Sequence, residues 1–134
     1  MLNVIMASLM NKAIDCGYSV IVDNRFSSRT PSAVNPYTKT IVVNGSWHDP
    51  EQLPFQLAHE MGHLINKDDS NCLYFSPSKH GIEGRANRQA VKLLLPYYTD
   101  DRPIEEFNSI DFMRAFKIPQ YLENVVNEEF YKNY

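Results

Sequence analysis

The segment at residues 57–65 constrains this chain most, because it carries two histidines, His59 and His63, four residues apart. On an α-helix this spacing places both imidazoles on one face, one turn apart, where they can bind the same metal ion. Glu60 follows the first histidine and can reach a water bound to that metal. The surrounding residues are mostly apolar, which predicts that the helix is buried and that its ligands are held still. The H-E-x-x-H pattern therefore predicts a metal site on a buried helix rather than two unrelated histidines.

Length and charge narrow the class of protein. The 134 residues predict one domain, covering residues 1–134, and the 43% hydrophobic and 22% charged content is typical of a soluble globular chain. A net charge of −3 argues against direct binding to nucleic acid, which needs a basic face. No apolar run is long enough for a membrane span. The apolar N-terminus lacks a positive leader, and the two cysteines fit reduced thiols, so we expect a cytoplasmic protein.

Apolar periodicity and turn residues predict the elements. Helices are expected over residues 2–16, around the histidines, over 81–95 with an end before Pro96, and over 103–116 and 119–131. The histidine helix begins either at Pro54 or after a short turn capped by Asp49. Strands are expected over residues 18–23 and 38–44, with a short one around Phe26. The prediction is a mostly helical α+β single domain with a small sheet.

A catalytic zinc usually takes three protein ligands and keeps a fourth position for water. Glu83 is the favoured third ligand, because the 20 residues after His63 suffice for a loop and a return on a second helix. Asn87 lies one turn further along the same helix face, where it can hydrogen-bond a ligand imidazole. Small residues at Ala86 and Ala90 would let the two helices approach closely.

Other residues compete for the third position. Asp69 stands six residues after His63, a spacing that some short zinc proteases use for an aspartate ligand. Those proteases usually carry glycine three residues after the second histidine, where this chain has Asn66. His80 and Cys72 are further alternatives.

The ligand set predicts zinc-dependent hydrolysis. Zinc makes its bound water acidic and polarises a carbonyl, while Glu60 acts as the general base and passes the proton to the leaving amine. A donor for the oxyanion is also required. His80 and Tyr74 are candidates, with Tyr97 and Tyr98 as further ones. The strand at residues 41–43 could offer its edge to an extended substrate.

A family resemblance rests on two paired motifs. The chain reads L-A-H-E-M-G-H at residues 57–63, then E-x-x-A-N at 83–87 and L-L-x-P at 93–96. With the stretch at residues 112–122, these resemble the ImmA/IrrE family of metallopeptidases over about residues 40–130. One departure is Gln89, where many members carry phenylalanine; we expect it to affect core packing more than metal binding.

The resemblance implies a zincin-like core with a gluzincin-like site: His59, His63 and Glu83 as zinc ligands and Asn87 behind them. It also implies an intracellular protease whose substrate is a helix-turn-helix repressor of a phage or mobile element. An alternative is an antirepressor that keeps the zinc fold but acts by association. Retention of Glu60 favours the enzyme, since a binding protein has no need of it. A structural zinc site would need four ligands and more cysteine than this chain offers.

Overall fold

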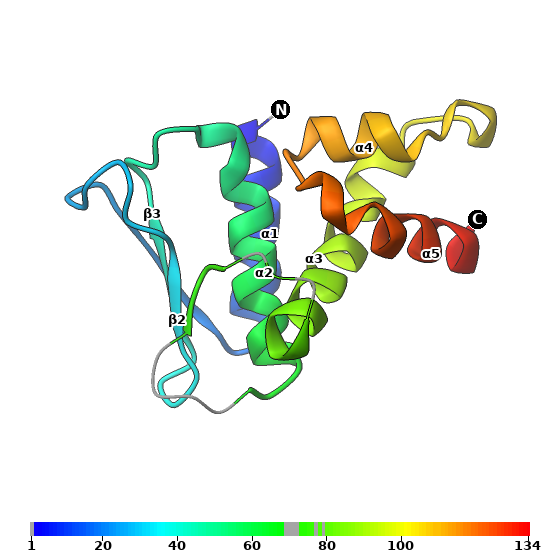
Figure 1. Ribbon diagram of the computed structural model, residues 1–134. Helices are drawn as coiled ribbons and strands as arrows, with labels where there is room; N and C mark the ends of the chain where they lie inside the picture. Colours follow the sequence, from blue (N-terminus) through cyan, green and yellow to red (C-terminus); the bar gives the residue numbers. More distant parts are fainter. Residues whose placement is uncertain (1, 69–72, 77, 79) are drawn as a thin grey trace.

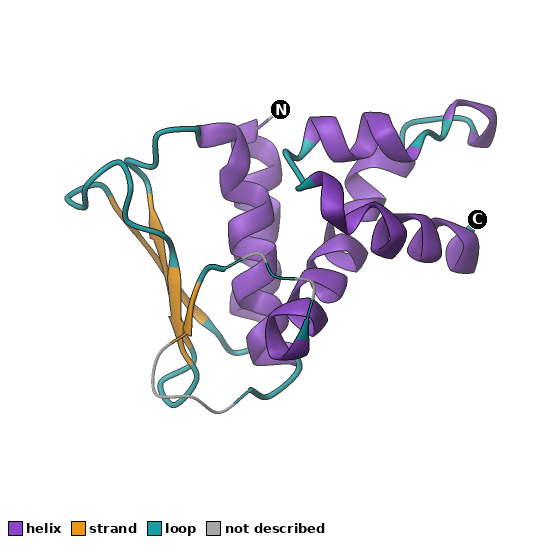
Figure 2. Cartoon of the chain, viewed as in Figure 1, coloured by secondary structure: helices purple, strands orange, loops and turns teal. Residues whose placement is uncertain are grey.

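A computed structural model describes residues 2–68, 73–76, 78 and 80–134, with the side chain of residue 2 left out. Within these residues a small sheet lies on one side of the molecule and the helices lie on the other (Figures 1 and 2). The α+β, mostly helical fold expected from the sequence is confirmed. No described helix has the length and apolar character needed to cross a membrane.

The helices are described first, because they form most of the core. The described part of the chain forms α1 (Leu2–Asp15), α2 (Leu53–Ile65), α3 (Gly81–Thr99), α4 (Ser109–Ala115) and α5 (Glu123–Asn133). Short 3-10 turns precede three of them, at Pro50–Gln52, Ile104–Glu106 and Gln120–Leu122.

Four described strands form one sheet in the order β1-β3-β2-β4. They are β1 (Ser19–Asp23), β2 (Ala33–Asn35), β3 (Thr40–Asn44) and β4 (Leu73–Tyr74). β1 runs parallel to β3, with Val20 opposite Ile41, whereas β2 is antiparallel to both β3 and β4. β3 is therefore an interior strand, and the expectation that residues 41–43 offer an edge to substrate is wrong.

α2 is the centre of the fold. Residues 53–64 are all buried, which is typical of a helix covered on every side. α1 packs behind it through Leu9 and Ala13, and the sheet supplies Val34, Ile41 and Val43. Among the described elements, α2 and α3 make the most extensive contact. The two histidines thus lie on a helix that is buried along almost its whole length.

The start of α2 confirms one of the two sequence alternatives. Asp49 accepts a hydrogen bond from the backbone N–H of Glu51 and caps a single 3-10 turn. α2 then begins at Leu53, so that Pro54 lies within its first turn. Proline is tolerated there because the N–H it lacks would have no helical partner.

Two boundaries differ from the expectation. Phe26 is exposed and lies outside any strand, while the backbone carbonyls of Ser27 and Thr30 accept hydrogen bonds from Asn44, so this segment is held as a loop. α3 does not end before Pro96 but continues to Thr99. The burial of Tyr98 among aromatic rings outweighs the one helical hydrogen bond that proline removes.

Candidate metal centre

Two imidazoles lie together on α2. His59 and His63 are one helical turn apart, their ring centroids are separated by 4.9 Å, and neither residue is exposed. The four-residue spacing puts both rings on one face, and the burial of the whole helix restricts their motion. The sequence spacing therefore becomes a pair of neighbouring nitrogen donors.

Glu83 brings a carboxylate to these imidazoles from the first turn of α3. Its Oε2 atom lies 2.8 Å from Nε2 of His59 and 3.1 Å from Nε2 of His63. One ligand atom from each of the three side chains lies within 4.8 Å of the others. Two imidazoles and one carboxylate are the donor set of a catalytic zinc site that keeps a position for water. The residues therefore fit a zinc ion.

The second nitrogen of each imidazole is held by another side chain. Nδ1 of His59 lies 2.7 Å from Oδ1 of Asn87, and Nδ1 of His63 lies 2.8 Å from Oδ2 of Asp68. Asn87 also donates from Nδ2 to the backbone carbonyl of Ser78. Such partners fix the orientation of a ligand imidazole and leave Nε2 for the metal.

Asp68 was missed at the level of sequence. Its neighbour Asp69 was considered as a ligand because it stands six residues after His63. The role of Asp68 depends instead on the turn that follows α2. Asn66 keeps a right-handed backbone, and Lys67 makes the left-handed turn with φ 58°. The only sequence signal is an acidic residue just beyond the helix end.

The charged groups at the site shift the pKa values of Glu83 and His63. Burial alone would raise the pKa of Glu83, but hydrogen bonds and charge interactions with His59 and His63 lower it to about 2. Burial opposes protonation of His63, yet the Glu83 and Asp68 carboxylates outweigh it and raise the pKa of this imidazole. A proton on this imidazole and a metal ion compete for the same nitrogen.

Glu60 and Gly62 complete the motif on α2. Glu60 follows His59 directly and is fully buried. Gly62 faces α3: a Cβ atom built on it would lie 2.7 Å from the backbone oxygen of Ala86. Ala86 and Ala90 are themselves fully buried, so the expected close approach of the two helices is confirmed. Glycine at this position therefore brings the Glu83 helix within reach of the histidines.

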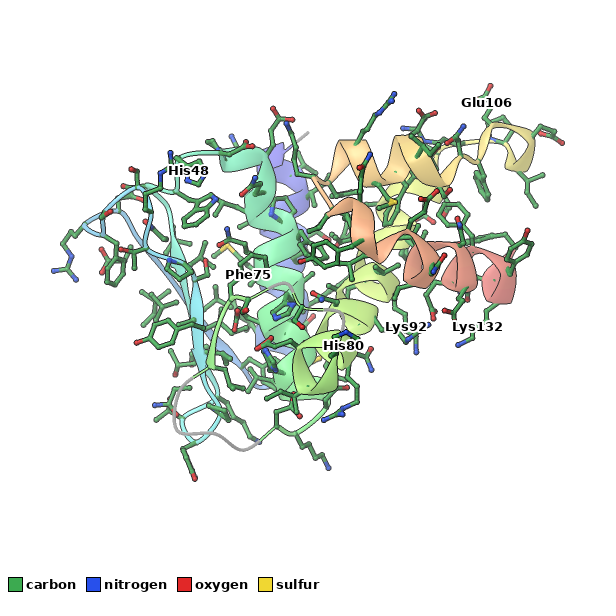
Figure 3. All side chains as sticks on the ribbon, in the orientation of Figure 1. His48, Phe75, His80, Lys92, Glu106 and Lys132 are labelled. Carbon is green, nitrogen blue, oxygen red and sulfur yellow. The ribbon has the colours of Figure 1, made fainter. Side chains whose placement is uncertain are left out.

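Phe75 is a neighbour of the site that the sequence did not indicate. Its ring centroid lies 5.0 Å from that of His59 and 6.0 Å from that of Phe55. Its backbone N–H donates to the carbonyl of Ser32, which ties the residue to the sheet. In Figure 3 the labelled Phe75 lies against α2 and His80 lies at the start of α3, whereas His48 lies at the distant end of the sheet.

Comparison with known proteins assigns the chain to a family. Residues 20–124 match the family model described as the IrrE N-terminal-like domain, a peptidase family. The chain belongs to this family. No curated protein and no solved structure gave a significant match. The matched residues of this IrrE N-terminal-like chain run from β1 into α5 and include every residue of the cluster.

The other predicted site residues of the IrrE N-terminal-like chain fall in different places. Asp69 and Cys72 lie outside the described residues. His80 is exposed and immediately precedes α3, and Tyr74 is exposed on β4. Neither side chain belongs to the group of three that converges. Among the described residues, the cluster able to hold a metal uses Glu83 and not His80.

Tyr97 and Tyr98 are not oxyanion donors. They stand in the last turns of α3, whereas Glu83 stands in its first. The hydroxyl of Tyr97 hydrogen-bonds Ser8 on α1, and that of Tyr98 accepts from the backbone N–H of Asn108. Both tyrosines therefore tie helices together away from the metal centre.

Gln89, the departure from the family pattern, makes a specific contact. Its side-chain amide donates to Oδ1 of Asn66 over 3.2 Å, which links α3 to the residue that ends α2. The substitution thus provides a hydrogen bond between the two helices that carry the cluster.

Proposed function

We propose that this chain is a zinc-dependent endopeptidase that cuts a specific intracellular protein, with a helix-turn-helix repressor of a phage or mobile element as its substrate. The observation that carries the proposal is the convergence of His59, His63 and Glu83 beside the buried Glu60, in a chain of a peptidase family. Neither a binding surface nor a structural metal site needs this combination of residues.

His59, His63 and Glu83 would hold the zinc ion. When bound, zinc supplies a Lewis acid that polarises a carbonyl group and makes water more acidic. Asn87 and Asp68 support this arrangement, because each fixes one imidazole through its Nδ1 atom. The donor set also suits other divalent ions, but two nitrogens and one carboxylate are the combination that zinc commonly takes in peptidases.

Glu60 supplies the proton transfers. As general base it accepts a proton from the attacking water, and it then gives this proton to the leaving amine, so that its carboxylate is regenerated after each cycle. Its position directly after His59 on the buried helix α2 supports this role, because the helix holds the carboxylate next to a ligand of the proposed zinc ion.

The oxyanion of the tetrahedral intermediate needs a hydrogen-bond donor. His80 and Tyr74 are the candidates in this proposal, since one precedes the Glu83 helix and the other precedes Phe75, whose ring contacts that of His59. Their side chains are exposed, which leaves them free to turn toward a bound peptide.

The repressor substrate and the cytoplasmic location follow from the ImmA/IrrE resemblance, now supported by the family match. A cleavage assay with a purified helix-turn-helix repressor tests the proposed substrate. We expect fragments in the presence of zinc and none after chelation. Stoichiometric inhibition of the repressor without fragments would instead identify a protein that acts by association.

A further inference from the structure

We propose that Asp68 is a positioning residue for His63 and that the turn at residues 66–68, tied to α3, sets the orientation of this imidazole. This exit turn is defined as Asn66, Lys67 and Asp68. The inference rests on the proposed metal-dependent function, because its consequence is the affinity and geometry of the metal centre.

The backbone of the exit turn fixes Asp68 relative to His63. The N–H of Asp68 donates to the carbonyl of His63 over 3.0 Å, and the N–H of Lys67 donates to the carbonyl of Leu64 over 3.1 Å. With Lys67 in the left-handed conformation at φ 58°, these two bonds form a Schellman motif. The turn that ends α2 therefore returns the carboxylate of Asp68 to the last turn of the same helix.

The carboxylate meets the imidazole in a nearly dry environment. Oδ2 of Asp68 lies 2.8 Å from Nδ1 of His63, and the side chains are 8% and 0% exposed. A histidine that donates its Nδ1 hydrogen to a carboxylate keeps the lone pair on Nε2. This Nε2 atom points to Glu83, at the position where the ligand atoms converge.

α3 holds the exit turn at two points. Gln89 donates to Oδ1 of Asn66 over 3.2 Å, and the guanidinium of Arg85 lies 3.8 Å from Oδ1 of Asp68. Arg85 is largely exposed, so its ion pair is the weaker link, and the hydrogen bond from the half-buried Gln89 is the stronger one. α3 also carries Glu83 and Asn87. This one helix therefore positions all three ligands: Glu83 directly, His59 through Asn87, and His63 through the exit turn.

Metal affinity and ligand geometry test this inference without any substrate. Zinc affinity is measured by competition with a chromophoric chelator, and geometry is measured by the visible absorption of the cobalt-loaded chain. We expect Asp68→Ala to weaken zinc binding by about 10- to 100-fold and to alter the cobalt bands. Asp68→Asn keeps an oxygen acceptor for Nδ1 and should recover most of the affinity, along with the wild-type cobalt bands.

Asp101→Ala is the matched control, because it removes an exposed aspartate outside the cluster and should bind zinc as the wild type does. If Asp68→Ala does not fold, Gln89→Ala tests the same turn without touching a partner of His63, and a several-fold loss of affinity is expected. Unchanged affinity and cobalt bands in Asp68→Ala, or in Gln89→Ala when it is used instead, would overturn the inference. A wild-type chain that binds neither ion would overturn the proposed function itself.

Discussion

Glu60 is the residue whose substitution separates metal binding from turnover. Glu60→Gln preserves the size of the side chain but removes its basicity, so we expect metal content to stay at the wild-type level and kcat to fall by about 10²- to 10⁴-fold. Metal analysis of the purified variant and a cleavage assay measure the two properties. Cleavage at the wild-type rate would exclude Glu60 as the general base.

His59→Ala provides the contrasting result. It removes a ligand and also leaves Oδ1 of Asn87 without its imidazole partner, so both the bound metal and the activity should be lost. Far-UV circular dichroism checks that this variant remains folded. A variant that still retains a full equivalent of zinc would argue against His59 as a ligand.

The sequence predicted the site residues whose positions depend on helix spacing, but not the one whose position depends on the conformation of a turn. His59 and His63 follow from the period of one helix, and Glu83 follows from a second helix at a plausible distance. Asp68 depends on the left-handed backbone of Lys67, a residue type that gives no signal for that conformation. Phe75 reaches His59 through strand pairing, which a single chain does not reveal.

At the scale of elements, the crossing of α2 and α3 depends on Gly62. A methyl group there would press on the backbone of Ala86, which cannot move without shifting α3. We expect Gly62→Ala to lower the free energy of unfolding by about 1–3 kcal/mol and to weaken metal binding, as measured by denaturant titration and chelator competition. Helix propensity alone would raise stability by about 0.5–1 kcal/mol, so a more stable variant would refute the packing argument.

The contact between α3 and α5 centres on a buried carboxylate. Glu129 is 1% exposed and accepts from Arg88 over 2.7 Å, while its neighbour Glu128 is 56% exposed and lies 3.4 Å from the same guanidinium. Glu129→Gln should reduce the free energy of unfolding by about 1.5–3 kcal/mol, because the amide oxygen can still accept from Arg88 but the guanidinium loses its negative partner in a dry position.

Glu128→Gln is the matched control for this contact. The same chemical change at an exposed position should alter stability by about 1 kcal/mol or less. Urea denaturation of both variants gives the comparison. Equal effects would mean that burial of Glu129 contributes nothing particular to the joining of the two helices.

The element boundaries show where local signals lose to packing. The expected strand around Phe26 is a loop because Asn44 binds its carbonyls, and β2 forms instead at residues 33–35, where Val34 can be buried. α3 passes through Pro96 because the aromatic cluster around Tyr98 holds its last turn. Strand order likewise depends on long-range pairing, so the interior position of β3 could not be read from its composition.

For the molecule as a whole, metal binding and stability should be linked. A ligand that binds only the folded chain, at about 100 times its dissociation constant, adds about 2.7 kcal/mol to the free energy of unfolding, which raises Tm by about 10 °C in a domain of this size. Thermal denaturation with zinc and with a chelator measures the difference. The His63→Ala variant is the control and should show little shift; an equal shift there would point to zinc binding elsewhere.

The fold also has a kinetic consequence. The three clustered side chains and both partners of their imidazoles lie between residues 59 and 87, on α2, on the exit turn that follows it and on α3. The contacts that Glu83 and Asn87 make with the histidines span 20 to 28 residues of sequence, and the paired positions of β1 and β3 are 21 residues apart, so the metal centre and the sheet close loops of similar entropic cost. Neither part therefore has a topological head start in folding, and an ion held by the completed centre should slow unfolding rather than speed up folding.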